Sequence, residues 1–150
     1  MEYSTLRFTV ENPSSINDLG LEFWLNDTKF FDNTIGTGQH NIIHTFDSKT
    51  SGQHLLRIVL KNKTVDHTLI DDQCKIIQDA VLKIHNIYLD DILLDQVFNE
   101  LAIYKHDFNG TGHWSDHPFY GLMGCNGIVE LAFETPFYLW LLENTHYHKY

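Results

Sequence analysis

The residues from His113 to His117 combine two imidazoles, a carboxylate and a hydroxyl in the short run His-Trp-Ser-Asp-His. Imidazole and carboxylate groups bind zinc, but a structural zinc site takes four ligands and no further ligand is evident near this run. The glycine-rich stretch 105–127 around it predicts a loop, which fixes no geometry between the ligands. We therefore predict that Asp116 and His117 contact a ligand or partner and that no metal is bound here.

Aromatic side chains accompany this run, since Trp114 lies within it and Phe119 and Tyr120 follow it closely. Their faces could stack on sugar rings, whose C–H edges are apolar. They could equally fold over the end of the domain and seal it. An aromatic-rich loop suits an interface and a cap alike, so Trp114 and Tyr120 are predicted contact residues and the cap stays open as the alternative.

Carboxylates crowd the polar segment 61–79, at Asp66, Asp71, Asp72 and Asp79. Calcium takes several oxygen ligands, which such a segment can supply. The spacing does not match an EF-hand loop, so a solvated acidic loop is the preferred interpretation. We expect no cofactor. Calcium is the alternative, with Asp71, Asp72 and Asp79 as its candidate ligands.

Alternation of apolar and polar residues identifies the elements that would position these groups. Strands are predicted at 5–10, 21–25, 28–31, 40–46, 53–60, 80–89 and 127–133. We expect the strands at 53–60 and 80–89 to share one sheet. The link between them, 61–78, is too long for a hairpin, so it crosses between sheets or carries function.

Two segments depart from simple alternation. Residues 94–101 have apolar side chains at helical spacing, which is compatible with a short helix or an edge strand, and the all-β context favours the strand. Thr135-Pro136 predicts the start of a helix over 136–144, because a capping hydroxyl precedes proline at the first helical position.

Apolar residues fill nearly every position of this terminal helix, more than one core-facing stripe needs. The helix either plugs the open end of the fold or docks on a neighbouring subunit, and docking is favoured for part of it. An aromatic residue on the polar face of the strand 21–25 raises the same question. The predicted assembly residues are Trp24, Phe137, Tyr138 and Trp140.

Length and composition set the broad class. A chain of 150 residues with regularly spaced strands and turns predicts one domain, 1–150, that is an all-β, jelly-roll-like β-sandwich with a short C-terminal helix. The net charge of −10 repels phosphate and makes nucleic acid an unfavourable partner. The longest apolar run is too short to span a bilayer, and no export signal is visible.

Several motifs that would carry chemistry are missing. The sequence contains no nucleophile elbow, Walker loop, dinucleotide fingerprint or zinc-protease motif, so we expect no enzymatic activity. The two cysteines, Cys74 and Cys125, are too few for a disulfide framework, and we expect both to be reduced and mostly buried.

Two stretches resemble known families. The runs GQHLLRIVLKNKT and DAVLKIHNIYLDD resemble the second half of small, calcium-dependent, xylan-binding-like carbohydrate-binding modules. The closing GIVELAFETPFYLWLLEN resembles short virion structural proteins of marine tailed phages of the cyanophage type. The calcium ligands of the modules do not map onto this chain position by position.

These resemblances imply a non-enzymatic β-sandwich that decorates or joins the tail, baseplate or head of a phage particle. Such a protein would be made in the host cytoplasm and would contact other virion proteins or itself. The alternative is a module that binds host surface glycans through Trp114 and Tyr120, with or without calcium.

Overall fold

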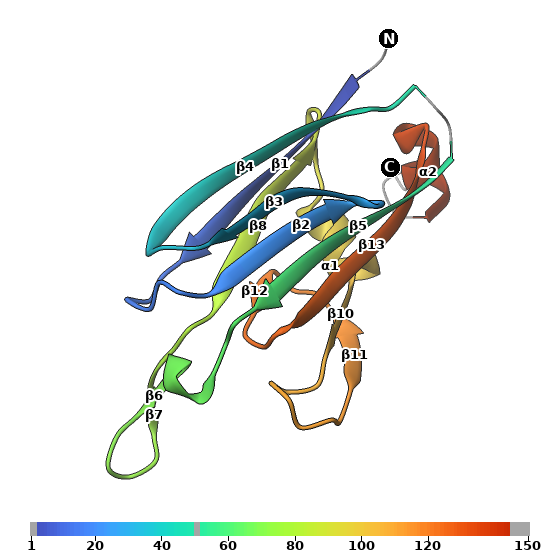
Figure 1. The fold of residues 1–150 in the computed structure, drawn as a ribbon. Helices are drawn as coiled ribbons and strands as arrows, with labels where there is room; N and C mark the ends of the chain where they lie inside the picture. Colours follow the sequence, from blue (N-terminus) through green and yellow to red (C-terminus); the bar gives the residue numbers. More distant parts are fainter. Residues whose placement is uncertain (1–2, 50–51, 145–150) are drawn as a thin grey trace.

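The computed structural model describes residues 3–49 and 52–144, which form two antiparallel sheets packed face to face (Figure 1). The first sheet has the strand order β12 (Leu122–Met123), β8 (Leu82–Leu89), β1 (Tyr3–Asn12) and β4 (Gly38–Asp47), with β9 (Ile92–Leu93) also paired to β8. The second has the order β11 (Ser115–Pro118), β10 (Ile103–His106), β13 (Gly127–Thr135), β5 (Gly52–Lys61), β2 (Gly20–Leu25) and β3 (Thr28–Thr34).

The predicted all-β sandwich with a short C-terminal helix is confirmed. The seven strands predicted from alternation are all present, and the chain changes sheet between β1 and β2, between β3 and β4, and again between β4 and β5. Alternation explains the core, because every second residue of a strand faces the opposite sheet. The buried side chains form one cluster, which includes Leu6, Phe8 and Val10 of β1 and Leu56, Ile58 and Leu60 of β5.

The link between β5 and β8 gives one confirmed and one wrong prediction. It does cross between sheets, as expected from its length. The two strands therefore do not share a sheet, because a period of two shows that one face is buried but not which sheet the strand joins. The link itself contains a short 3-10 helix, Val65–His67, and a separate hairpin of β6 (Thr68–Ile70) and β7 (Ile76–Asp79).

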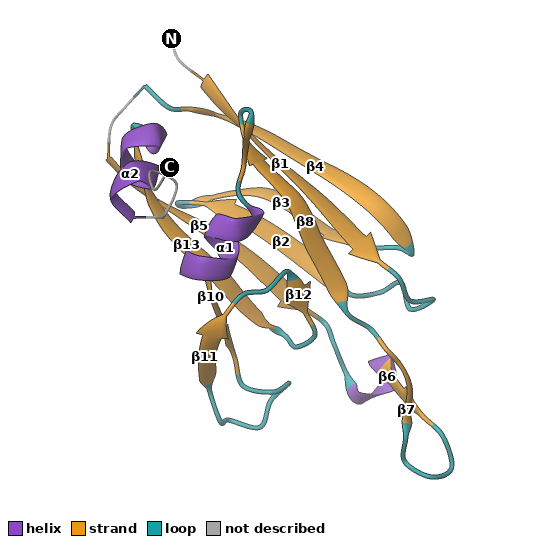
Figure 2. Ribbon diagram, turned by 180° about the vertical axis from the view of Figure 1, so that it is seen from behind, coloured by secondary structure: helices purple, strands orange, loops and turns teal. Residues whose placement is uncertain are grey.

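The prediction of an edge strand at 94–101 is wrong, because this segment forms helix α1 (Asp95–Leu101). Val97 and Phe98 are buried, so the helical spacing of the apolar residues decided the structure and the all-β context did not. Figure 2 shows α1 on the side of the sandwich where β8 and β10 lie.

The stretch 105–127 is also more regular than predicted. It contributes the end of β10, all of β11 and all of β12, and β10 pairs with both β11 and β13. The residues of this stretch in β10, β11 and β12 are Lys-His, Ser-Asp-His-Pro and Leu-Met, without a β-branched residue, and the glycines lie between the strands, so the composition resembled a loop.

Helix α2 (Phe137–Asn144) begins one residue after the predicted start at Pro136 and closes one end of the sandwich (Figure 1). Phe137, Trp140 and Leu141 are buried. The ring of Phe133 on β13 lies 5.6 Å from that of Phe137 and 6.4 Å from that of Trp140. No helix within the described residues is long and apolar enough to cross a membrane.

Candidate functional site

A groove of about 440 Å³ lies beside α1, between β8 and the segment that leads into β12. Its buried lining is apolar and comes from Ile84, Ile87, Phe98 and Phe119. Polar side chains surround this apolar part, namely Glu11, Lys83, His85, Asp95 and Asn99. An apolar lining with a few polar groups is the usual composition of a small-ligand site.

A backbone hydrogen bond and a glycine position the segment Phe119–Leu122 on one side of the groove. The backbone N–H of Ile84 donates to the carbonyl of Gly121 at 2.8 Å, which ties the Phe119–Leu122 segment to β8. Gly121 has a φ of +92°, and a Cβ atom there would lie 3.3 Å from the Ile84 carbonyl oxygen. The positive φ therefore favours glycine, and a side chain at this position would also be tight against the Ile84 carbonyl.

On the other side of the groove, Asp95 connects helix α1 to strand β8 by hydrogen bonds. Its carboxylate accepts hydrogen bonds from the backbone N–H groups of Asn86 and Ile87, at 3.0 and 2.8 Å. Asn86 has a φ of 49° and lies where the pairing between β1 and β8 shifts register. The carboxylate thus satisfies two backbone donors at an irregular part of β8 and fixes the start of α1 against it.

The polar part of the groove has one incompletely satisfied group. His85 Nε2 lies 3.7 Å from Glu11 Oε2, and this buried nitrogen makes no hydrogen bond within the described part of the chain. Tyr120, with 70% of its surface exposed, lies beside these polar groups with Leu122. The groove therefore combines the exposed aromatic face of Tyr120 with a carboxylate, that of Glu11, while His85 Nε2 is buried.

The structure places the predicted contact residues in different parts of the surface. Tyr120 lines the groove, whereas Trp114, 68% exposed at the start of β11, is not among the lining residues. Phe119 is buried in the core, so it belongs to the cap and not to an exposed platform. Burial therefore agrees with the cap interpretation for Phe119, whereas contact of Trp114 and Tyr120 with a ligand or partner stays a prediction.

Asp116 and His117 also point in different directions, because they are neighbours on the strand β11. Asp116 is exposed and lies opposite Lys105 of β10 in the ladder. His117 faces His106, a buried residue of β10 that sequence reasoning did not single out, and their Nε2 atoms are 2.8 Å apart.

The hydrogen bonds around His106 and His117 indicate which nitrogen of each ring carries a proton. The N–H of Phe108 donates to His106 Nδ1 at 3.2 Å, so the proton of His106 resides on Nε2 and is donated to His117 Nε2. His117 Nδ1 then donates to the Pro118 carbonyl at 3.1 Å. Burial, and then the neighbouring His117, lowers the pKa of His106, which favours the neutral form of that ring.

This arrangement occupies both Nε2 atoms, which a metal ion at the pair would need. Within residues 3–49 and 52–144, no three His, Cys, Asp or Glu side chains are grouped to hold a metal. The three calcium candidates lie apart along the hairpin: Asp71 and Asp72 follow β6 at its turn, and Asp79 ends β7 at its base. The Asp71 carboxylate accepts the N–H groups of Gln73 and Lys75.

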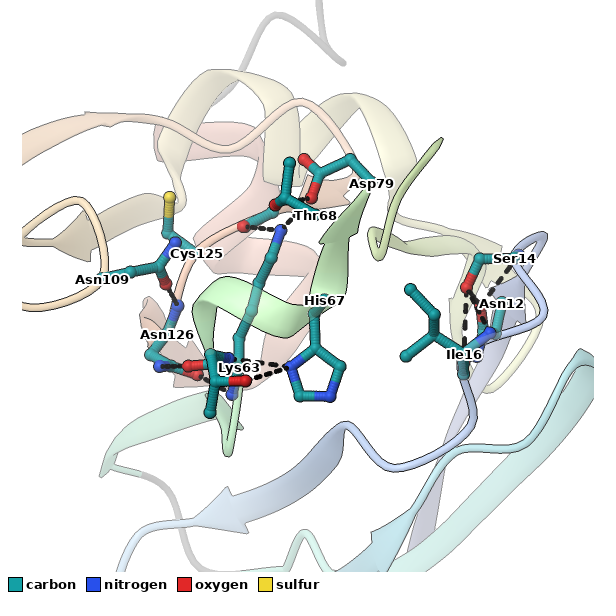
Figure 3. Close-up of polar contacts among 12 residues, drawn as sticks. Asn12, Ser14, Ile16, Lys63, His67, Thr68, Asp79, Asn109, Cys125 and Asn126 are labelled. Carbon is teal, nitrogen blue, oxygen red and sulfur yellow. Dashed lines mark hydrogen bonds and ion pairs between the residues drawn. The ribbon is translucent and has the colours of Figure 1, made fainter. Parts of the chain in front are cut away.

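Asp79 instead belongs to a buried polar cluster at the base of the β6–β7 hairpin (Figure 3). The ammonium of Lys63, whose side chain is 2% exposed, donates to Asp79 at 2.7 Å and to the Gly124 carbonyl at 2.6 Å. Thr68 donates to the same Asp79 oxygen at 2.7 Å. Asn126 bonds both the N–H and the carbonyl of Lys63, each at 2.8 Å.

The other predicted assembly surface, Trp24, is covered from within the chain. Its ring lies 5.5 Å from the Lys29 ammonium and 5.1 Å from the Arg57 guanidinium, and its Nε1 donates to Glu22 at 2.8 Å. The hydrogen bond from Lys61, and then that from Trp24, lowers the pKa of Glu22. Cation–π contacts of this kind satisfy an aromatic face without a partner.

The cysteine prediction is partly wrong. Both thiols are free, but Cys74 is exposed in the turn of the β6–β7 hairpin and Cys125 is only half-buried. Burial raises the pKa of the Cys125 thiol. The Tyr104 hydroxyl donates to the Cys125 carbonyl and accepts from its N–H at 3.0 Å, and burial raises the pKa of Tyr104.

Comparison with known proteins adds no relative to this description: no protein-family model and no curated protein matches the chain.

Proposed function

We propose that this protein is a non-enzymatic structural module of a tailed-phage particle, joined to its neighbours through the outer face of α2. The observation that carries the proposal is that α2 has two apolar faces and the sandwich uses only one. Phe137, Trp140 and Leu141 face inward, whereas the outer face consists of Tyr138, Leu139 and Leu142, all exposed.

The exposed residues of the outer face of α2 form one continuous surface. Positions 138 and 139 both lie on the same side of the helix as position 142, because residues three and four apart are neighbours on the helix surface. Covering a large apolar side chain stabilises a complex by roughly 1.5–3 kcal/mol before ordering costs. A contiguous apolar surface next to a well-packed core is typical of a contact with another protein.

A second exposed apolar surface supports the same proposal. The β6–β7 hairpin exposes Leu69, Ile70, Ile76 and Ile77. Both ribbon views place this hairpin and α2 at opposite ends of the sandwich (Figures 1 and 2). A module inside a particle has neighbours on more than one side, and two separate apolar surfaces suit that position.

The test uses paired charge substitutions. In cells that produce the whole particle, Leu139→Lys with Leu142→Lys should remove the tagged protein from gradient-purified particles. Leu122→Lys, which alters an exposed leucine beside the groove, is the matched control and should be incorporated normally. Normal incorporation of the double variant, or absence of the unaltered protein from particles, would contradict the proposal.

Glycan binding is the second candidate function, and the groove beside α1 favours it. Tyr120 offers an exposed aromatic face next to Glu11 and Asn99, which can hydrogen-bond sugar hydroxyls. Tyr120→Ala should abolish any binding on a glycan array, whereas Tyr138→Ala should not. An array without signal, with and without calcium, would eliminate this candidate.

A further inference from the structure

The sheet edges of this sandwich differ in how they are protected from pairing with another chain. An exposed edge strand presents unpaired N–H and C=O groups, and proteins block such edges with charges, proline, bulges or short strands. Strand β12 has two residues, and β11 has four and ends in Pro118. Strand β3 carries the ion pair of Lys29 with Asp32 and a register shift against β2.

Strand β4 lacks most of these protections, since its one carboxylate is Asp47 at its last residue. It is ten residues long and pairs with β1 in one uninterrupted register, from Tyr3 opposite Asp47 to Asn12 opposite Gly38. Its sequence, GQHNIIHTFD, contains no lysine, arginine, glutamate or proline. Among the described strands β4 pairs with β1 alone, and it forms the outermost strand of its sheet in both ribbon views.

The pairing of β1 shows which groups of β4 face the open edge. The Thr5 carbonyl accepts the N–H of Asp90 at 2.8 Å, so the backbone of Thr5 points away from β4. The N–H and C=O groups of successive residues point to opposite sides of a strand. Ser4, Leu6 and Phe8 therefore form hydrogen bonds with the residues that lie opposite them on β4. The edge-facing residues of β4 are consequently Gln39, Asn41, Ile43, Thr45 and Asp47.

We propose that β4 pairs antiparallel with β4 of a second copy of this chain, about a two-fold axis at Ile43, so that the two first sheets become continuous. In an antiparallel ladder hydrogen-bonded residues lie opposite hydrogen-bonded residues. The register centred on Ile43 meets this rule for all the edge-facing residues.

The same register is self-complementary in its side chains. Ile43, 63% exposed in the single chain, lies against its own copy. Asn41 then lies opposite Thr45, and Asp47, the one carboxylate of the strand, lies opposite Gln39. No like charges meet, although each chain has a net charge of −10. A surface that complements itself in this way suits a two-fold dimer.

The mass of the full chain in solution, measured by sedimentation equilibrium over a range of concentrations, tests the pairing. The unaltered protein should be a dimer, and Ile43→Lys should halve its mass. Ile103→Lys is the matched control, because it adds the same charge at an exposed isoleucine of β10, an internal strand. That control should remain a dimer.

A second variant and a second measurement cover the case in which Ile43→Lys fails to fold. Thr45→Lys changes another edge-facing residue and should also dissociate the dimer. In the unaltered protein, amide exchange followed by NMR should be slow at Asn41, Ile43 and Thr45, whose N–H groups would be solvent-exposed in a monomer.

A monomer at every concentration overturns the pairing, as does a dimer that Ile43→Lys and Thr45→Lys leave intact or one with fast exchange at these amides. A dimer dissociated by Leu139→Lys but not by the β4 variants also overturns it, and assigns self-association to α2. Particle incorporation of the α2 variants is a separate readout, so the proposed function can fail while the pairing stands.

Discussion

Helix α2 and the β6–β7 hairpin both extend from the sandwich and both expose apolar side chains, but they are held in opposite ways. One whole face of α2 is buried against Phe133, so the helix is fixed by apolar packing. The hairpin is fixed at its base by polar contacts of Lys63, Asp79 and His67, while its isoleucines remain exposed. The difference shows that the apolar residues of a segment can be packed on one face, as in α2, or on neither, as in the hairpin.

The largest expected effect is at the inner face of α2. Trp140→Ala removes a buried indole and leaves a cavity beside Phe133, which should lower the free energy of unfolding by about 3–5 kcal/mol. Urea unfolding followed by circular dichroism measures the change. Tyr138→Ala on the outer face should stay within about 0.5 kcal/mol of the unaltered protein. Equal effects at the two positions would mean that the helix does not have two distinct faces.

A smaller loss is expected at the base of the hairpin. Lys63→Met leaves Asp79 and the Gly124 carbonyl without their charged donor, which should cost about 2 kcal/mol, in the range for hydrogen bonds to charged groups. Trypsin should then cut faster after Lys75, in the hairpin turn. Lys61→Met, at a half-buried lysine that pairs with Glu22 and Asp32 and not with the hairpin, is the control and should leave this cleavage rate unchanged. An equal acceleration would show that the buried cluster does not anchor the hairpin.

Acid should weaken the α2 end of the sandwich. Burial lowers the pKa of His54, whose ring lies 5.2 Å from that of Phe133, below the ordinary value of 6.5. The unfolded chain then binds more protons than the folded chain, so stability is fully present above about pH 6.5 and falls as pH drops toward the folded pKa. His54→Gln should reduce the slope of the urea midpoint against pH in this window; an unchanged slope would exclude His54 as a contributor.

The smallest effect on stability is expected at the exposed surface of the hairpin. Ile76→Ser with Ile77→Ser should change the free energy of unfolding by no more than about 0.5 kcal/mol per site, because neither side chain is buried. Thermal unfolding measures this. A large loss would show that these side chains pack within the chain and are not available to a neighbour.

The strands could be predicted because each buries one face, and Leu6, Phe8 and Val10 show the resulting alternation directly. Their assignment to sheets could not, since β5 and β8 have the same pattern and lie in different sheets. Helix α1 was recognisable from Val97 and Phe98, but the surrounding strands argued against it.

The site residues were harder to predict, because their roles depend on contacts between distant segments. Tyr120, which lines the groove, was predicted as a contact residue from its aromatic context, whereas Glu11 and His85 meet at the groove only through the pairing of β1 with β8. Lys63 has no feature in the sequence that distinguishes it from Lys61, yet one is buried and the other bonds exposed carboxylates. The alternation of β11, once its strand is known, is the signal that separates Asp116 from His117.

The burial of Trp140, which is part of α2, also affects the intrinsic fluorescence of the protein. The three indoles of the chain have different surroundings. Trp140 is buried in the apolar interior, Trp114 is exposed to solvent, and Trp24 lies beside two cationic side chains. Release of α2 would hydrate Trp140 and shift its emission to the red, while Trp114 would emit as before. Intrinsic fluorescence can therefore report detachment of this helix without an added label.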